Sequence, residues 1–263
     1  MKSITKNRKG IILAGGTGSR LYPLTKIISK QLLPVFDKPM IFYPLSTLMC
    51  AGIKEVLIIS DQFNLPLYKK IFGNGENFGI TIKYKIQFKP NGIAESILIA
   101  ENFLNGSPSA LILGDNIFAG KKFTNNLSKI NSDTENCHIF LKPVRCPQRF
   151  GVPHFDSRGN IKKIIEKPHE PCSKFAVTGL YFFNENAVNL SKKLTYSKRG
   201  ELEITDLLNL YINKNQNLNF TIMDKNTYWY DTGTFDSLLE ASIKIKNLRK
   251  RKNKIGEIDF LLK

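Results

Sequence analysis

The sequence predicts an α/β fold in which helices flank a central mixed, mainly parallel sheet, as in Rossmann-like domains. In the first half, short apolar runs alternate with stretches of helical periodicity, which is typical of βαβ units. In the second half, apolar runs follow one another across short turns, which predicts a mixed sheet there. The length of 263 residues is sufficient for one large domain of this kind.

The elements of the first half follow from this alternation. Each expected strand is a short apolar run, and a helical pattern comes after it. The expected strands are residues 10–14, 55–60, 80–85 and 109–113, and the expected helices are residues 40–51, 65–71, 92–103 and 123–130.

The second half begins with strands and ends with helices. Ser157-Arg158-Gly159-Asn160 has the composition of a hairpin turn. The expected strands are residues 137–143, 151–155, 161–166, 176–183 and 219–223, and the expected helices are residues 203–213 and 234–251. We find no internal repeat and no low-complexity linker, so we expect a single domain over residues 1–263.

The composition limits the classes of partner. A net charge of +17 suits a polyanion, either nucleic acid or a phosphorylated small molecule. A skewed composition rich in Asn, Ile and Lys is an equally simple explanation of the net charge. We interpret the dense basic run 244–254 as the solvated end of the last helix. No apolar run is long enough to span a membrane. The four cysteines form no CxxC pair and share no metal-ligand spacing with the histidines, which predicts a cytoplasmic protein without zinc.

A glycine-rich loop follows the first strand. Gly15, Gly16 and Gly18 let the backbone turn tightly and bring its N–H groups close to an anion, and Arg20 adds a fixed charge suited to phosphate oxygens. The loop matches neither a dinucleotide fingerprint nor a Walker A motif. A plain strand–turn connection is therefore the alternative.

Two aspartates follow strand ends and have a glycine close by. Asp115 lies in Leu113-Gly114-Asp115-Asn116, and Asp231 comes directly after Tyr228-Trp229-Tyr230. Such a pair of carboxylates can hold Mg²⁺, a hard cation that retains water and substrate phosphate oxygens. The alternative for each aspartate is a helix N-cap or an Asx-turn.

Other polar positions are candidates by their place at loops and strand ends. Lys30 can add a second charge beside Arg20, and the amide of Gln87 can recognise a base edge because it both donates and accepts. Without further context each is equally an ordinary surface or loop residue. The remaining candidates are Gly92, Glu166, Lys167 and Arg199.

These motifs together resemble the sugar-phosphate nucleotidyltransferases, and most closely the short-chain glucose-1-phosphate thymidylyltransferases. The resemblance covers about residues 8–250, and the order and spacing of the motifs are far more specific than any one of them. They are residues 10–21, 29–41, 113–116, 166–168, 177–181, 199–206, 231–234 and 238–242.

The resemblance implies a nucleotide-diphospho-sugar transferase fold with a nucleotide-binding half at about 8–135 and a sugar-phosphate-binding half at about 136–250. It implies transfer of a thymidylyl group from dTTP to glucose 1-phosphate, which gives dTDP-glucose and pyrophosphate and begins dTDP-rhamnose or deoxysugar synthesis. It also implies a homo-oligomer, either a tetramer or a dimer. Family members usually continue further, so we expect residues 251–263 to be a basic, truncated tail.

The resemblance also implies roles for the candidates. The catalytic residues would be Arg20, Lys30, Asp115 and Asp231, and the last two would bind Mg²⁺. The nucleotide would contact Gly15, Gly16, Thr17, Gly18, Arg20, Gln31, Gln87, Gly92 and Asp115. The sugar phosphate would contact Gly151, Glu166, Lys167, Val177 and Arg199.

Three other interpretations of the function stay open. Glu95-Ser96 stands where the family usually carries Gln-Ala, and uridylyl transfer or transfer to another sugar 1-phosphate is the alternative reaction. A catalytically silent regulatory homologue is a second alternative. A nucleic-acid binder is the third, and we expect no nucleic-acid partner because no aromatic-rich RNA motif or zinc finger is present.

Overall fold

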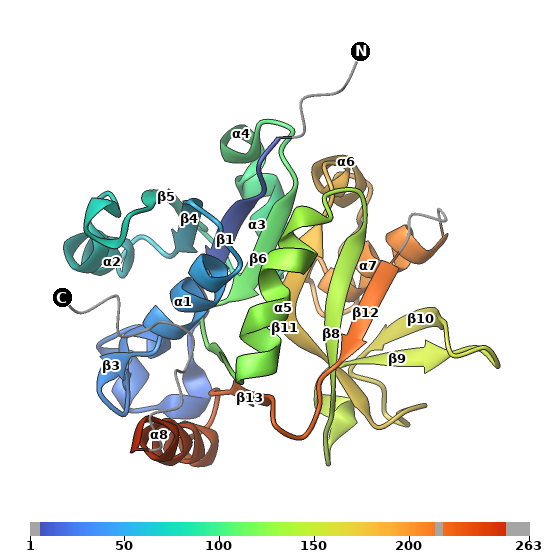
Figure 1. Cartoon of the computed structure of the whole chain (residues 1–263). Coiled ribbons are helices and arrows are strands. Elements are labelled where there is room, and N and C mark those ends of the chain that lie inside the picture. The colour runs from blue at the N-terminus through green and yellow to red at the C-terminus, as the bar shows by residue number, and fades with distance from the viewer. Residues whose placement is uncertain (1–5, 214–217, 251–263) are drawn as a thin grey trace.

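A seven-stranded sheet runs through the middle of the molecule (Figure 1). The computed structural model describes residues 6–213 and 218–250. In spatial order the strands are β12 (Leu218–Ile222), β8 (Cys137–Pro143), β11 (Phe175–Phe183), β6 (Ser109–Leu113), β1 (Lys9–Leu13), β4 (Glu55–Ser60) and β5 (Thr81–Ile86). Only β11 runs against its neighbours β6 and β8, while the other pairs are parallel. The predicted mixed, mainly parallel sheet is confirmed.

The inner strands of the sheet are largely apolar on both faces because each face is covered by helices. In β1, Ile11 faces the same core as Leu57 and Leu111. Its neighbour Ile12 faces the opposite core. Since successive side chains of a strand point to opposite faces, an uninterrupted apolar run is required.

The helices form two layers (Figure 1). On one face lie α1 (Phe42–Cys50), α2 (Leu65–Phe72) and α5 (Lys121–Ser132). On the other face lie α3 (Glu95–Ile99), α4 (Glu101–Leu104), α6 (Ala187–Ser191) and α7 (Ile204–Asn213).

Smaller elements surround the carboxyl edge of the parallel strands. β7 (Asn116–Ala119) pairs with β13 (Tyr228–Asp231), and β9 (Gly151–Phe155) pairs with β10 (Ile161–Glu166). β2 (Pro34–Val35) pairs with β3 (Lys38–Pro39) and packs with α8 (Phe235–Lys250) in a third core. Short 3-10 turns lie at Ser19–Leu21, Leu24–Lys26, Lys30–Leu32, Glu76–Phe78 and Pro147–Arg149.

The predicted helix 92–103 is wrong in its bounds. It begins at Glu95 and is divided at Ala100 into α3 and α4. Residues 91–94 instead pair with a distant loop, where Leu202 donates to the carbonyl of Asn91 and accepts from Ala94. A hydrogen bond to another segment outweighs the local helical pattern here. The short elements β7 and α6 had no prediction.

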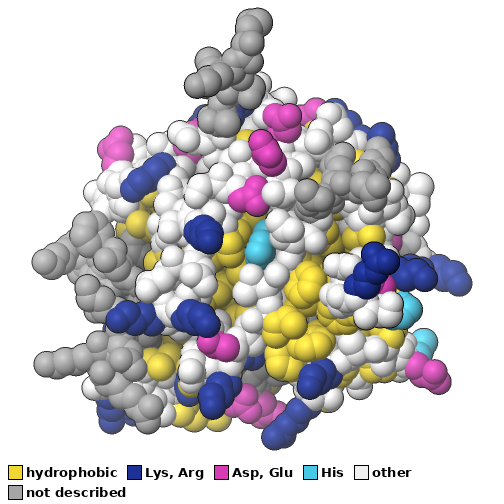
Figure 2. Space-filling model, turned by 45° about the vertical axis from the view of Figure 1, so that its right-hand side comes forward, with side chains coloured by type: hydrophobic (Ala, Val, Ile, Leu, Met, Phe, Trp, Pro, Cys, Tyr) yellow, Lys and Arg dark blue, Asp and Glu magenta, His cyan; other side chains and the backbone are white. Residues whose placement is uncertain are grey.

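Lys and Arg side chains lie dispersed over the face in Figure 2, where an apolar area is also visible. The end of the basic run 244–254 and the tail 251–263 lie outside the described residues. In the described part of the chain, no helix is both long and apolar enough to cross a bilayer.

Candidate active site

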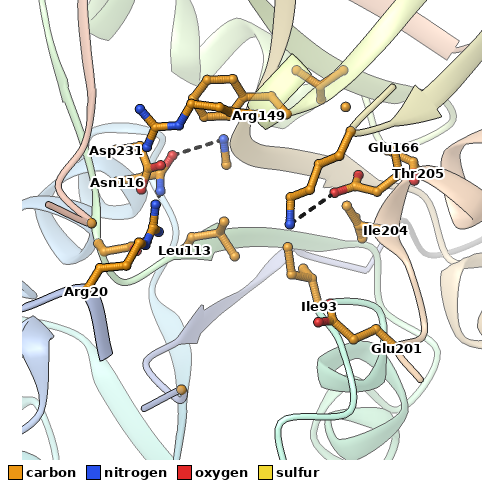
Figure 3. Close-up of a pocket in the computed structure, with 18 of the residues that line it drawn as sticks. Arg20, Ile93, Leu113, Asn116, Arg149, Glu166, Glu201, Ile204, Thr205 and Asp231 are labelled. Atoms are coloured by element: carbon orange, nitrogen blue, oxygen red, sulfur yellow. Dashed lines mark hydrogen bonds and ion pairs between the residues drawn. The ribbon is translucent and has the colours of Figure 1, made fainter. Parts of the chain in front are cut away.

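A cavity of about 570 Å³ opens at the carboxyl edge of the parallel strands. Ligands of open α/β sheets bind at this edge. Figure 3 shows the two ends of the cavity, with Arg20, Arg149 and Asp231 at one end and Glu166 and Glu201 at the other. Twelve of the predicted site residues line it: Gly16, Thr17, Gly18, Arg20, Lys30, Asp115, Gly151, Glu166, Lys167, Val177, Arg199 and Asp231.

The glycine-rich loop has the backbone that its composition predicted. Gly16 and Gly18 have φ values of 102° and 59°, which favour glycine. Arg20 follows on a 3-10 turn, and its Nη2 lies only 2.6 Å from where a Cβ on Gly233 would stand. The same point is 3.4 Å from Oδ1 of Asp231. The bare backbone of Gly233 therefore lets Arg20 approach Asp231.

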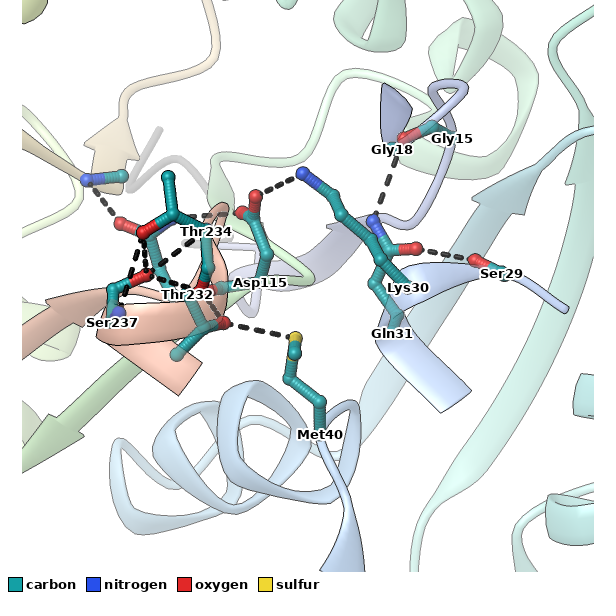
Figure 4. Close-up of polar contacts among 12 residues, drawn as sticks. Gly15, Gly18, Ser29, Lys30, Gln31, Met40, Asp115, Thr232, Thr234 and Ser237 are labelled. Carbon is teal, nitrogen blue, oxygen red and sulfur yellow. Dashed lines mark hydrogen bonds and ion pairs between the residues drawn. The ribbon is translucent and has the colours of Figure 1, made fainter. Parts of the chain in front are cut away.

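Asp115 is buried and held by two donors. Lys30 Nζ bonds to its Oδ2 (Figure 4). Asn116 Nδ2 donates to its Oδ1 at 2.9 Å. Burial alone would raise the pKa of this carboxyl, but the charge and hydrogen bond of Lys30 outweigh it, and the pKa is lowered. The side chains of Lys30 and Asp115 are only 15% and 11% exposed, so water screens this ion pair little.

Asp231 is more easily protonated than Asp115. Its pKa is raised by burial first and by the charge of Asp115 second, and Lys30, Arg20 and Arg149 offset this only in part. A backbone link holds the two segments together, because the N–H and hydroxyl of Thr232 both donate to the Asp115 carbonyl, at 3.1 and 2.7 Å.

This donor set suits Mg²⁺. Two neighbouring carboxylates provide hard oxygen ligands and an excess of negative charge that a divalent cation would neutralise. Among the described residues, no group of three or more His, Cys, Asp or Glu side chains could hold a metal ion. Water and substrate oxygens would have to complete the coordination.

The other end of the cavity is rich in paired charges. Glu166 lies 3.7 Å from Lys167 Nζ and 3.4 Å from Arg199 Nη1. Its pKa is raised, chiefly by burial. Arg199 also bonds to Glu201 at 2.8 Å, so acidic groups already surround its charge. Lys167 has a φ of 42°, which is uncommon for a non-glycine residue and is found at functional sites.

Arg149 and Asn116 are among the lining residues that had no sequence prediction. Arg149 faces Asp231 from the turn before β9 (Figure 3). Asn116 is buried, and its Oδ1 accepts from the Gly179 N–H at 3.1 Å and from Trp229 Nε1 at 2.6 Å. Its place directly after Asp115 is the one signal that could have identified Asn116, whereas the sequence around Arg149 contains none.

A second hollow of about 400 Å³ lies on the other side of the glycine loop. Gly15, Gln87 and the exposed rings of Phe63 and Phe88 line it, and Gly16 and Thr17 line both hollows. Gln31 lines neither one, because its buried side chain lies under the loop, with Nε2 3.5 Å from the Gly15 carbonyl and Oε1 accepting from Ser29 (Figure 4).

Gly92 also lines neither hollow, and its bare backbone packs closely against Leu202. Its φ is 112°, and a Cβ there would lie 2.4 Å from the carbonyl oxygen and 2.6 Å from the nitrogen of Leu202. These are backbone atoms that cannot move aside without breaking the pairing between residues 91–94 and Leu202.

We expect Gly92→Ala to lower the free energy of unfolding by about 3 kcal/mol, because it adds a steric clash to an unfavourable φ. Gly159→Ala is the matched control: its φ is 83°, but no atom lies within 4 Å of the added Cβ. Urea unfolding of both variants measures the difference. Equal losses would show that the contact with Leu202 contributes nothing.

The chain is similar to known proteins along most of its length. The family model described as nucleotidyl transferase matches residues 9–247. A glucose-1-phosphate thymidylyltransferase of Neisseria meningitidis serogroup A is 45% identical over 93% of this chain and 85% of its own length. One from Mycolicibacterium smegmatis is 42% identical over 94% and 86%.

Solved structures share the fold. A Bacillus anthracis protein assigned as a glucose-1-phosphate thymidylyltransferase, in complex with sucrose, superposes with a TM-score of 0.83 at 38% identity, over 91% of this chain and 96% of that one. A UDP-glucose pyrophosphorylase bound to UDP-glucose has a TM-score of 0.80 at 24% identity, over 92% and 99%. The second likeness concerns the fold alone.

Proposed function

The chain belongs to the nucleotidyl transferase family, and on this premise we infer that it has glucose-1-phosphate thymidylyltransferase activity. It transfers a thymidylyl group from dTTP to glucose 1-phosphate, which yields dTDP-glucose and pyrophosphate. One observation on the site supports this assignment: Lys30, Asp115 and Asp231 lie together with Arg20 and Arg149 in one cavity.

The reaction needs charge and position rather than a protein nucleophile. A phosphate oxygen of glucose 1-phosphate forms a bond to the α-phosphorus of dTTP. The bond from that phosphorus to the bridging oxygen breaks, and pyrophosphate leaves with this oxygen. Fixed donors and cations that face the developing negative charge lower the barrier of such a displacement.

The two ends of the cavity suit the two substrates. The loop Gly15–Gly18 and Arg20 would bind the triphosphate through backbone N–H groups and a guanidinium. Glu166 lies at the opposite end, and Lys167 pairs with it there. A carboxylate can accept from sugar hydroxyls, and an ammonium can pair with the sugar phosphate. Gly151, Val177 and Arg199 line the cavity with them.

Lys30 would act between these ends. In the structure its ammonium is paired with Asp115, and it would shift toward the phosphates when the substrates and a cation are bound. Asp115 and Asp231 would hold Mg²⁺, which neutralises phosphate charge when bound. Arg149 faces Asp231 and would add a third positive charge to those of Arg20 and Lys30.

Gln87 and the hollow beside Gly15 would receive the base. Gln87 is 6% exposed, and its side chain lies in the wall of that hollow. Aromatic rings on which a base can stack line the same hollow. Gln31 would act indirectly by supporting the loop. Gly92 would shape the segment next to Gln87 rather than contact the base.

A nucleotide panel tests this function. With glucose 1-phosphate and Mg²⁺, we expect pyrophosphate release to be fastest with dTTP, and we expect chelation of the metal to stop it. Turnover of UTP well above that of dTTP would instead assign the chain as a uridylyltransferase. Absence of turnover with every nucleotide would indicate a silent homologue.

The cellular setting stays a prediction. The separated cysteines favour a reducing, cytoplasmic location. A homo-oligomer, either a dimer or a tetramer, and the lack of a nucleic-acid partner are likewise predictions. Size-exclusion chromatography with light scattering would determine the oligomeric state.

A further inference from the structure

The side chain of Glu95 lies directly behind the proposed base-binding glutamine. Gln87 Nε2 donates to Oε2 of Glu95 at 2.7 Å, and Asn91 Nδ2 donates to Oε1 at 2.8 Å. Both oxygens of the carboxylate are thus bound. An ionised carboxylate only accepts hydrogen bonds, so it requires the nitrogen of Gln87, and not its oxygen, on this side.

The oxygen of Gln87 consequently points the other way. Its Oε1 lies 2.8 Å from where a Cβ on Gly15 would stand, next to the phosphate-binding loop. The Gln87 backbone is also fixed, because its N–H donates to the Ser60 carbonyl at 2.8 Å at the end of β4. Gln87 is therefore held through its backbone N–H and through its side-chain nitrogen. Its side-chain oxygen then lies at the wall of the hollow.

The segment that carries Asn91 is fixed as well. Leu202 donates to the Asn91 carbonyl at 2.7 Å, and the Asn91 N–H donates to the carbonyl of Lys89 at 2.9 Å. Glu95 itself begins α3. The chain of bonds from Leu202 through Asn91 and Glu95 to Gln87 therefore leaves the carboxylate little freedom to turn away.

We propose that Glu95 is a positioning residue that sets the nucleobase preference by fixing the orientation of the Gln87 amide. This inference rests on the proposed role of Gln87 toward the base. A carbonyl oxygen accepts from the N3–H of thymine or uracil. Cytosine has an unprotonated N3 that repels this oxygen, and it would instead suit the amide nitrogen of a rotated Gln87.

The variant Glu95→Gln tests the proposal with little change in shape. A neutral amide at position 95 can both donate and accept, so either orientation of Gln87 becomes possible. We expect the ratio of kcat/KM for dTTP to that for dCTP to fall about tenfold. The change should lie mainly in KM for dTTP, with kcat nearly unchanged. Glu101→Gln is the control, since Glu101 lies on α4 and, within the described part of the chain, its side chain pairs with exposed Lys192 alone.

A double-mutant cycle with Gln87→Ala completes the test. When Gln87 is absent, Glu95→Gln should no longer alter the nucleotide ratio. An equal loss with dTTP and dCTP would show that Glu95 only supports the segment, and this outcome overturns the proposal. If Gln87→Ala itself leaves the ratio unchanged, the base role of Gln87 fails, and the inference fails with it. A wild-type protein with no preference for dTTP over dCTP would overturn the proposed function as well.

Discussion

Asp231→Asn should abolish nearly all turnover and at the same time stabilise the folded chain. The variant removes one of the two carboxylates available for Mg²⁺, and we expect kcat to fall about 10³-fold, comparable to the loss of a principal group that stabilises transition-state charge. Burial and the nearby charge of Asp115 raise the pKa of Asp231, so the ionised form is disfavoured in the folded state.

The sign of the stability change follows from this raised pKa. The folded chain binds the Asp231 proton more tightly than the unfolded chain does. The resulting stabilisation is present below the unfolded pKa and is lost as the pH rises through the folded pKa. Asparagine cannot ionise, so the variant should have a Tm a few degrees higher at neutral pH without Mg²⁺.

Thermal unfolding with and without Mg²⁺ measures both effects. The wild-type Tm should increase with Mg²⁺, because a ligand of the folded state stabilises it, and this increase should vanish in Asp231→Asn. Asp236→Asn is the matched control, an exposed aspartate in the first turn of α8. Normal turnover in Asp231→Asn, or an unchanged response to Mg²⁺, would contradict the metal role.

Lys30→Ala should retain the fold and lose most of the turnover. The ammonium of Lys30 is the only side-chain cation paired with Asp115 among the described residues. We expect kcat to fall about 10²–10³-fold because one fixed charge at the phosphates is removed. KM should change less, since the loop and Arg20 remain in place to bind the triphosphate.

The pH dependence of Lys30→Ala provides a second readout. Lys30 keeps the pKa of Asp115 low against the effect of burial. Without it this pKa rises, and the acidic limit of the residual activity should move to higher pH. Lys121→Ala, an exposed lysine at the start of α5, is the control. Near-normal kcat, or loss of kcat with an unmoved acidic limit, would exclude this role of the ion pair.

The strands were the most predictable part of the fold. Runs such as Ile11-Ile12-Leu13 lie between two cores, and two-sided burial leaves a direct record in the sequence. The segment 92–103 was less predictable, because the pairing of Asn91 and Ala94 with Leu202 depends on a loop more than a hundred positions away.

The candidate site also contains residues that a local motif predicts and residues that only their contacts identify. The glycine loop with Arg20 and the motif around Asp115 are local, since a backbone that must approach an anion requires glycine at particular positions. Arg149 had no local signal, and Glu95 stood out only as a departure from the Gln-Ala that the family usually carries. Their significance depends on what they face, and Arg149 faces Asp231 while Glu95 faces Gln87.

Local sequence patterns therefore predict the α/β class, the covered parallel strands and a set of polar residues at strand ends. Those properties follow from periodicity and backbone chemistry within a few residues. The folded chain is needed to show that Lys30 pairs with Asp115 across 85 positions and that Asp231 lies beside them. Strand order and the pairing of β7 with β13 bring these groups together, and both arise from packing between distant segments, which no local pattern encodes.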